Sequence, residues 1–253
     1  MANKDRQSGE VVESGTANEP AETSNPAQIA EFVETARRLG PLRRSGERGR
    51  LIFALDATMS RQPTWDSACR HQAEMFHQTA AVGGLDVQLV YFRGFRECRA
   101  SKWVDDPKRL ADLMTRIDCR GGHTQIGKVL AHARKEASKN RVHALVYVGD
   151  CMEEDIDHLC AEAGKLGLLH VPAFMFQEGH EPLAERAFRE IARLTGGAWC
   201  RFDSAAANQL RELLSAVAVY AAGGRAALEN LSAKSGRGRL LLEQLRLARC
   251  RHS

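Results

Sequence analysis

Short apolar runs and longer helical patterns alternate along most of this chain. The first apolar run, residues 50–56 (RLIFALD), is continuous rather than alternating, as expected for a strand that is buried on both faces. Further runs that fit strands lie at residues 85–92, 98–104, 142–150, 170–177 and 198–203. Helical patterns separate most of these runs, which indicates a parallel sheet with helices on both faces.

The connections between the runs indicate the topology. One amphipathic helical pattern starts near Trp65 and ends near Gly83, and others cover residues 106–117, 126–139, 155–167, 181–197 and 205–222. Only a short turn at Gly94 separates the second run from the third, and a parallel crossover does not fit into so few residues. These two runs therefore predict an antiparallel hairpin. The predicted fold class is α/β, with a mostly parallel six-stranded sheet that carries one antiparallel edge strand.

Composition divides the chain into four segments. Residues 1–26 are acidic and poor in large apolar side chains, so they predict a disordered arm. Residues 27–49 predict a short helix and a basic linker, and residues 50–222 predict one α/β domain. Residues 223–253 predict a separate helical tail, which has seven basic and two acidic residues from Arg225 onward.

The overall composition, 43% hydrophobic and 27% charged, is that of an ordinary globular protein. No apolar run approaches the roughly 18 to 20 residues of a membrane span, and the start, MANKDRQSGE, does not resemble a signal peptide. The seven cysteines include no C-x-x-C pair, so we expect reduced thiols, no structural zinc and a cytoplasmic location. The net charge of +4 and the few aromatics among the basic residues do not favour nucleic acid as a partner. The basic tail is interpreted as a solvated helix face, with an acidic partner surface or RNA as the alternative.

Oxygen-bearing side chains follow the first predicted strand. Asp56, Thr58 and Ser60 occupy alternate positions, so an extended turn can direct a carboxylate and two hydroxyls the same way. Such a set suits Mg²⁺, which prefers oxygen ligands and keeps several waters. The alternative is that Asp56 only caps the following turn and the hydroxyls satisfy local backbone groups.

Two further loops are predicted at the same edge of the sheet, because ligands of open parallel sheets bind outside the carboxyl ends of the strands. Thr124 lies in the sequence GGHTQ of residues 121–125, and Asp150 ends the fourth apolar run. Three loops with carboxylate or hydroxyl oxygens are therefore expected to converge.

Together, the D-x-[ST]-x-S pattern, the Gly-Gly loop bearing a Thr, and the Asp after the fourth strand resemble the metal-ion-dependent adhesion site of von Willebrand factor A domains. The resemblance covers roughly residues 50–222, is to intracellular bacterial-type members, and implies a Rossmann-like fold. It also implies that Asp56, Thr58, Ser60 and Thr124 surround Mg²⁺ or Mn²⁺, while Asp150 acts through water. An open coordination position would then bind an acidic side chain of a partner protein.

The sequence departs from this family pattern at three positions. Thr58 replaces the commoner Ser and adds a methyl group. His123 separates the glycines from Thr124, and Gly149 stands where a Thr often precedes the last Asp. None of these differences removes an oxygen ligand.

Other residues near the predicted site have simpler interpretations. His123 is expected to shape its loop rather than act as a catalytic base, since no nucleophile lies near it in the sequence. The acidic residues after Asp150 are interpreted as the acidic first turn of a helix. They are Glu153, Glu154, Asp155 and Asp157. The three tryptophans, Trp65, Trp103 and Trp199, are expected to pack in the core.

These observations favour a protein without enzymatic activity that binds a partner through a metal ion. The first alternative is a phosphohydrolase similar to haloacid dehalogenases, which also places an Asp after a hydrophobic strand and uses Mg²⁺. That chemistry needs a second Asp two residues later, where this chain has Thr58. The second alternative is a metal-free structural adaptor that acts through its terminal helices. The sequence indicates neither the partner nor the oligomeric state.

Overall fold

The computed structural model describes residues 48–58, 65–66, 84–202, 214–223 and 230. Several sequence predictions lie outside these residues. They concern the arm of residues 1–26, almost all of segment 27–49, most of the helix expected after Trp65, and nearly all of the basic tail. Ser60, one of the predicted metal ligands, also lies outside the described residues.

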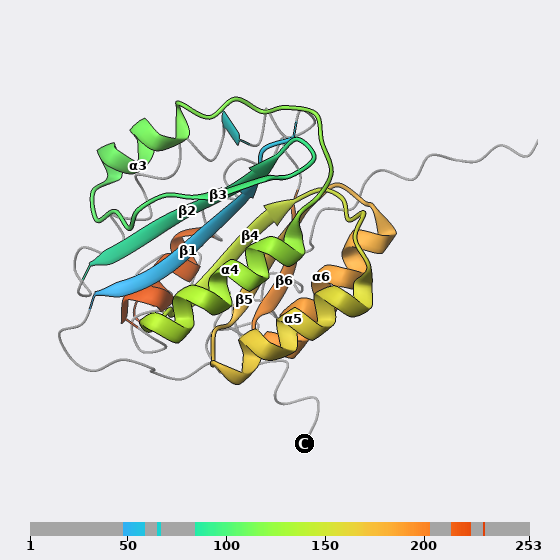
Figure 1. The fold of residues 1–253 in the computed structure, drawn as a ribbon. Coiled ribbons are helices and arrows are strands. Elements are labelled where there is room, and N and C mark those ends of the chain that lie inside the picture. The colour runs from blue at the N-terminus through green and yellow to red at the C-terminus, as the bar shows by residue number, and fades with distance from the viewer. Residues whose placement is uncertain (1–47, 59–64, 67–83, 203–213, 224–229, 231–253) are drawn as a thin grey trace, which may run out of the picture.

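A six-stranded sheet forms the centre of the molecule, with the strand order β3-β2-β1-β4-β5-β6 (Figure 1). The strands are β1 (Gly49–Asp56), β2 (Leu85–Arg93), β3 (Glu97–Ala100), β4 (Ala144–Gly149), β5 (Ala173–Glu178) and β6 (Ala198–Phe202). Neighbouring strands pair in parallel except β2 and β3, which form an antiparallel pair at one edge. The predicted fold class, including its single antiparallel edge strand, is confirmed.

The third predicted strand, residues 98–104, is shorter in the structure. β3 ends at Ala100, and Val104 pairs with Val87 only in an isolated bridge. Ser101 is the reason, because its hydroxyl accepts a hydrogen bond from the backbone N–H of Leu89 at 3.0 Å. A side-chain oxygen thus takes the place that a backbone carbonyl has in a regular ladder.

Four of the helices predicted from the sequence, all of which follow the β2–β3 hairpin, are confirmed with small changes at their ends. They are α3 (Pro107–Met114), α4 (Ile126–Lys139), α5 (Ile156–Leu168) and α6 (Pro182–Thr195), and residues 214–223 are also helical. Asp106 and Glu181 cap α3 and α6, each before a proline at the first turn, and Gly196 ends α6 in the left-handed conformation with φ of 69°. Among the helices of the described residues, none combines the length and apolar character that a membrane span requires.

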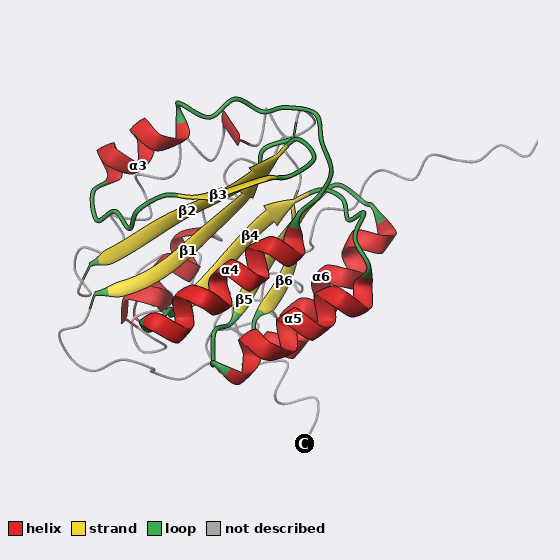
Figure 2. Ribbon diagram, viewed as in Figure 1, coloured by secondary structure: helices red, strands yellow, loops and turns green. Residues whose placement is uncertain are grey.

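Both faces of the sheet are covered, which explains why the first apolar run does not alternate. Leu51, Phe53 and Leu55 of β1 belong to a core that includes α3 and the helix of residues 214–223. Ile52 and Ala54 belong to a second core beneath α4, α5 and α6. Figure 2 shows these three helices side by side across one face of the sheet. Trp65 and Trp199 are buried as predicted, and Trp103 is partly buried against the second core.

Candidate metal centre

The sheet topology places the loops after β1 and β4 next to each other. The chain runs from β1 outward to β2 and β3, and then returns to β4 on the other side of β1. In open α/β sheets this reversal leaves a crevice at the carboxyl ends of the two central strands. Leu55 of β1 pairs with Val148 of β4, so Asp56 and Asp150 emerge at the same edge within two residues of that pair.

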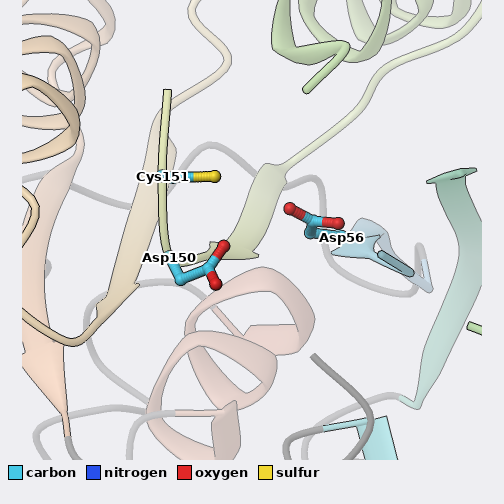
Figure 3. Close-up of side chains that lie close together, drawn as sticks. All are labelled: Asp56, Asp150 and Cys151. Atoms are coloured by element: carbon cyan, nitrogen blue, oxygen red, sulfur yellow. The ribbon is translucent and has the colours of Figure 1, made fainter. Parts of the chain in front are cut away.

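Asp56 and Asp150 approach each other closely at this edge. One carboxylate oxygen of each, together with the Sγ atom of Cys151, lies within 4.8 Å of the others (Figure 3). Asp56 is almost completely buried, with 2% of its surface exposed, whereas Asp150 and Cys151 are partly exposed. The group is therefore buried at Asp56 and reaches the protein surface at Asp150 and Cys151.

Backbone hydrogen bonds hold Ala57 and Thr58, the first residues after β1, in place. The N–H of Thr58 donates to Oδ1 of Asp56 at 2.8 Å, so this carboxylate also stabilises its own turn. The N–H of Ala57 donates to the carbonyl of Phe92 at 3.0 Å, and the carbonyl of Ala57 accepts from the N–H of Arg120 at 2.9 Å. Ala57 is thereby bonded to β2 through Phe92 and to the loop that carries Thr124 through Arg120.

Thr124 is buried and is tied to the loop after β4 by a reciprocal pair of hydrogen bonds. Its N–H donates to Oε2 of Glu153 at 3.0 Å, and its hydroxyl oxygen accepts from the N–H of Glu153, also at 3.0 Å. A hydroxyl oxygen has a second lone pair, so this bond leaves Thr124 able to bind a cation. The loop of Thr124 is thus bonded both to Ala57, next to Asp56, and to the loop after β4 that carries Asp150.

The interpretation of the acidic residues after Asp150 is wrong for Glu153 and Glu154. α5 begins at Ile156, Asp155 is its cap, and only Asp157 lies in its first turn. Both carboxylate oxygens of Glu154 instead accept from the N–H groups that begin α4, those of Ile126 and of Gly127, the latter at 2.9 Å. These N–H groups lack partners within α4, so a carboxylate from another loop is a favourable cap.

The β2–β3 turn braces the loop of Thr124 from the other side. Nε2 of Gln125 lies 3.3 Å from each of three carbonyl oxygens in and beside that turn. The N–H of His123 donates to the carbonyl of Gly94 at 3.2 Å, and the His123 ring lies 5.2 Å from the ring of Phe95. Nδ1 of His123 is 3.1 Å from Oε2 of Glu153. These contacts agree with the expected role of His123 in shaping its loop.

The structure gives a physical reason for one departure from the family pattern. A Cβ atom added to Gly149 would lie 2.6 Å from the Oη atom of Tyr147, whose side chain is fully buried. The Thr that often precedes the last Asp in the family would therefore clash here. Gly149 and Tyr147 form a matched pair in this chain.

The donor atoms fit a hard divalent cation. Two carboxylates lie together at the centre, and two buried threonines belong to the loops that hold them. Burial raises the pKa of the Cys151 thiol to about 12, and the negative charge and hydrogen bond of Asp150 act in the same direction. At neutral pH the thiol is therefore uncharged in the absence of an ion.

Comparisons with known proteins agree with the fold. No protein-family model and no curated protein matches the sequence. The VWA domain of SpRpn10 matches with a TM-score of 0.52 and 14% identity, over 68% of this chain and 95% of that domain. An aerotolerance-related membrane protein from Bacteroides fragilis matches with a TM-score of 0.51 and 16% identity, over 66% of this chain and 96% of that one.

A third structure, proximal thread matrix protein 1 from the mussel byssus, has a zinc-occupied MIDAS motif. It matches with a TM-score of 0.54 and 14% identity, over 68% of this chain and 46% of that protein. At these identities the likeness concerns the fold. The strand order, the antiparallel edge strand and these matches together show that the chain contains a domain with the von Willebrand factor A fold.

Proposed function

We propose that this chain is a metal-dependent protein-interaction module without enzymatic activity of its own. Its ion would be Mg²⁺ or Mn²⁺, bound by Asp56, Thr58, Ser60 and Thr124, with Asp150 acting through water. The observation that carries the proposal is the approach of the Asp56 and Asp150 oxygens to within 4.8 Å of each other at the reversal point of the sheet. Carboxylate and hydroxyl oxygens are the ligands that such ions prefer.

The proposed centre favours an acidic partner. Hydroxyl ligands are neutral, and only Asp56 would bring a negative charge directly onto the ion, so the ion keeps much of its positive charge. A carboxylate from another protein can then complete the coordination shell with a strong charge-assisted bond. The phosphohydrolase alternative is not supported, because Thr58 stands where that chemistry needs an acid, and its N–H bonds to Asp56.

Replacing Asp56 by Asn is expected to weaken Mg²⁺ binding at least about 100-fold, since even the loss of an outer-shell partner costs metal sites about 10- to 100-fold. Isothermal titration calorimetry with Mg²⁺ and Mn²⁺ measures the two dissociation constants. Asp112→Asn, on the exposed surface of α3, is the matched control and should bind like the original protein. Equal Mg²⁺ affinity in the original chain and in Asp56→Asn would contradict the proposed centre.

Phe95 is the proposed apolar contact for the partner beside the ion. It lies in the β2–β3 turn with 74% of its surface exposed, and it contacts His123 next to Thr124. Exposed aromatic side chains are frequent contributors to binding energy at protein interfaces. The partner is therefore expected to contact both the ion and this ring.

Replacing Phe95 by Ser should reduce capture of the partner about tenfold, because an aromatic anchor contributes on the order of 1 to 2 kcal/mol or more. The measurement is a pull-down from the native source, with Mg²⁺ or with EDTA, using the original chain, Phe95→Ser and Asp56→Asn. Leu168→Ser is the control. Leu168 is also well exposed (82%), but it lies at the end of α5 next to the amino end of β5, which is the edge of the sheet opposite the metal centre. If capture of the partner is unchanged by Phe95→Ser and reduced by Leu168→Ser, the interface lies elsewhere.

A further inference from the structure

Cys151 immediately follows Asp150 and belongs to the same group of side chains. Figure 3 shows its sulfur and the carboxylates of Asp56 and Asp150 pointing toward a common space. Among the residues that the structure describes, these side chains form the only group of three or more His, Cys, Asp or Glu residues close enough to share an ion. Neither the sequence pattern nor the adhesion-site resemblance assigns a role to this thiol.

We propose that Cys151 is a sulfur ligand that extends the centre to thiophilic divalent ions such as Zn²⁺, Co²⁺ and Cd²⁺. This inference rests on the proposed metal-binding function and specifies which ions the centre holds most tightly. With Mg²⁺ or Mn²⁺ the oxygens alone bind the ion. With a thiophilic ion the sulfur joins Asp56 and Asp150, and the affinity increases.

The distances allow this arrangement with little movement. A zinc–sulfur bond is about 2.3 Å and a zinc–carboxylate bond about 2.0 to 2.2 Å, so ligand atoms on one tetrahedral ion lie about 3.6 Å apart. The three ligand atoms here lie within 4.8 Å of one another. A contraction of up to about 1.2 Å between these atoms, from 4.8 Å to about 3.6 Å, therefore brings all of them onto one ion, and side-chain rotation can supply it.

A sulfur ligand determines which divalent ions bind most tightly. Thiolate sulfur is a soft ligand that favours Zn²⁺ and similar ions, whereas Mg²⁺ takes oxygen ligands almost exclusively. When the ion binds, a metal–sulfur bond replaces the S–H bond, and the proton leaves to the solvent. No electron is transferred, so the step needs neither an oxidant nor a reductant.

The loops leave Cys151 in a position that suits a ligand. Thr124 bonds to Glu153, and Glu154 bonds to the start of α4, so the backbone just after Cys151 is fixed on two sides. Cys151 itself is partly exposed, which leaves a path for an ion. A ligand whose backbone is already ordered loses little conformational freedom when the ion arrives.

The test compares the original chain with Cys151→Ser and Cys160→Ser. Cys160, a partly exposed cysteine of α5, is the matched control. Titration with Co²⁺ should produce a sulfur-to-cobalt charge-transfer band that is absent from Cys151→Ser and retained in Cys160→Ser. By calorimetry, Cys151→Ser should lower Cd²⁺ affinity at least about tenfold, as expected from the cost of perturbing metal sites, and leave Mg²⁺ affinity within about twofold.

The outcomes separate this inference from the proposed function. Mg²⁺ binding that depends on Asp56, with a cobalt band and Cd²⁺ affinity unchanged in Cys151→Ser, would overturn the sulfur ligand and leave the oxygen centre intact. Loss of the cobalt band in Cys151→Ser supports the sulfur ligand, even if Mg²⁺ does not bind. Loss of the band in Cys160→Ser instead would assign the signal to another site and reject the inference.

Discussion

The Phe188→Ala variant should unfold with a free energy lower by about 3 to 5 kcal/mol, the usual cost of removing a buried phenylalanine ring. Phe188 of α6 is fully buried, and its ring lies 5.3 Å from that of Tyr147 in an edge-to-face arrangement. Tyr147 in turn stacks at 6.3 Å on Phe92 of β2. The ring of Phe188 therefore ends a row of aromatics that joins α6 to the centre of the sheet.

Urea denaturation followed by circular dichroism measures this loss. Leu183→Ala is the control on the same helix, since Leu183 is 59% exposed and its truncation should change the free energy by less than about 0.5 kcal/mol. Added Mg²⁺ should still stabilise Phe188→Ala, because an ion that binds only the folded state acts through mass action. A loss below about 1 kcal/mol would mean that the second core repacks without this ring.

The Gly122→Ala variant should lose about 3 kcal/mol of stability and bind Mg²⁺ more weakly, because overpacking of a close contact forces backbone shifts. A Cβ atom at Gly122 would lie 2.1 Å from the carbonyl oxygen of Gly94. The atoms it meets belong to backbone, so a side-chain rotation cannot relieve the clash. The loop would have to move away from the β2–β3 turn, and Thr124 would move with it.

Gly121→Ala is a matched control one residue earlier. A Cβ atom at Gly121 has no neighbour within 4 Å, so this variant should keep both stability and Mg²⁺ affinity. Denaturation and calorimetry on the two variants separate the effect of the clash from a general effect of alanine in the loop. Equal behaviour of the two variants would show that the contact with Gly94 is unimportant.

Much of the fold follows from the sequence because burial leaves a clear pattern. From Leu51 to Leu55, β1 is apolar at every position because each of its faces meets a separate core, and this pattern predicts a central strand. The short turn at Gly94 excludes a crossover and thus predicts the antiparallel edge. The residue pattern does not predict where β3 ends, because that end depends on a hydrogen bond from the N–H of Leu89 in β2 to the Ser101 hydroxyl.

The candidate site was predictable only where its residues follow strand ends. Strand order brings Asp56 and Asp150 to one edge, and both positions can be read from the apolar runs before them. The position of the Cys151 sulfur depends on how the backbone turns after β4, which the residue pattern does not determine. The sequence pattern placed Glu154 in the first turn of the following helix, whereas its carboxylate accepts from two N–H groups that lie 28 and 27 positions earlier in the chain.

The attachment of Glu154 to the start of α4 has a consequence for how an ion would be received. The same stretch of chain that carries Asp150 supplies the cap of α4, so it cannot swing outward without leaving two amide groups unsatisfied. The entropy of ordering the loop of Thr124 and the loop after β4 is lost when the domain folds rather than when a ligand arrives. A cation therefore binds to loops that are already ordered, and its affinity depends more on the ligand atoms of the site than on any rearrangement of the protein.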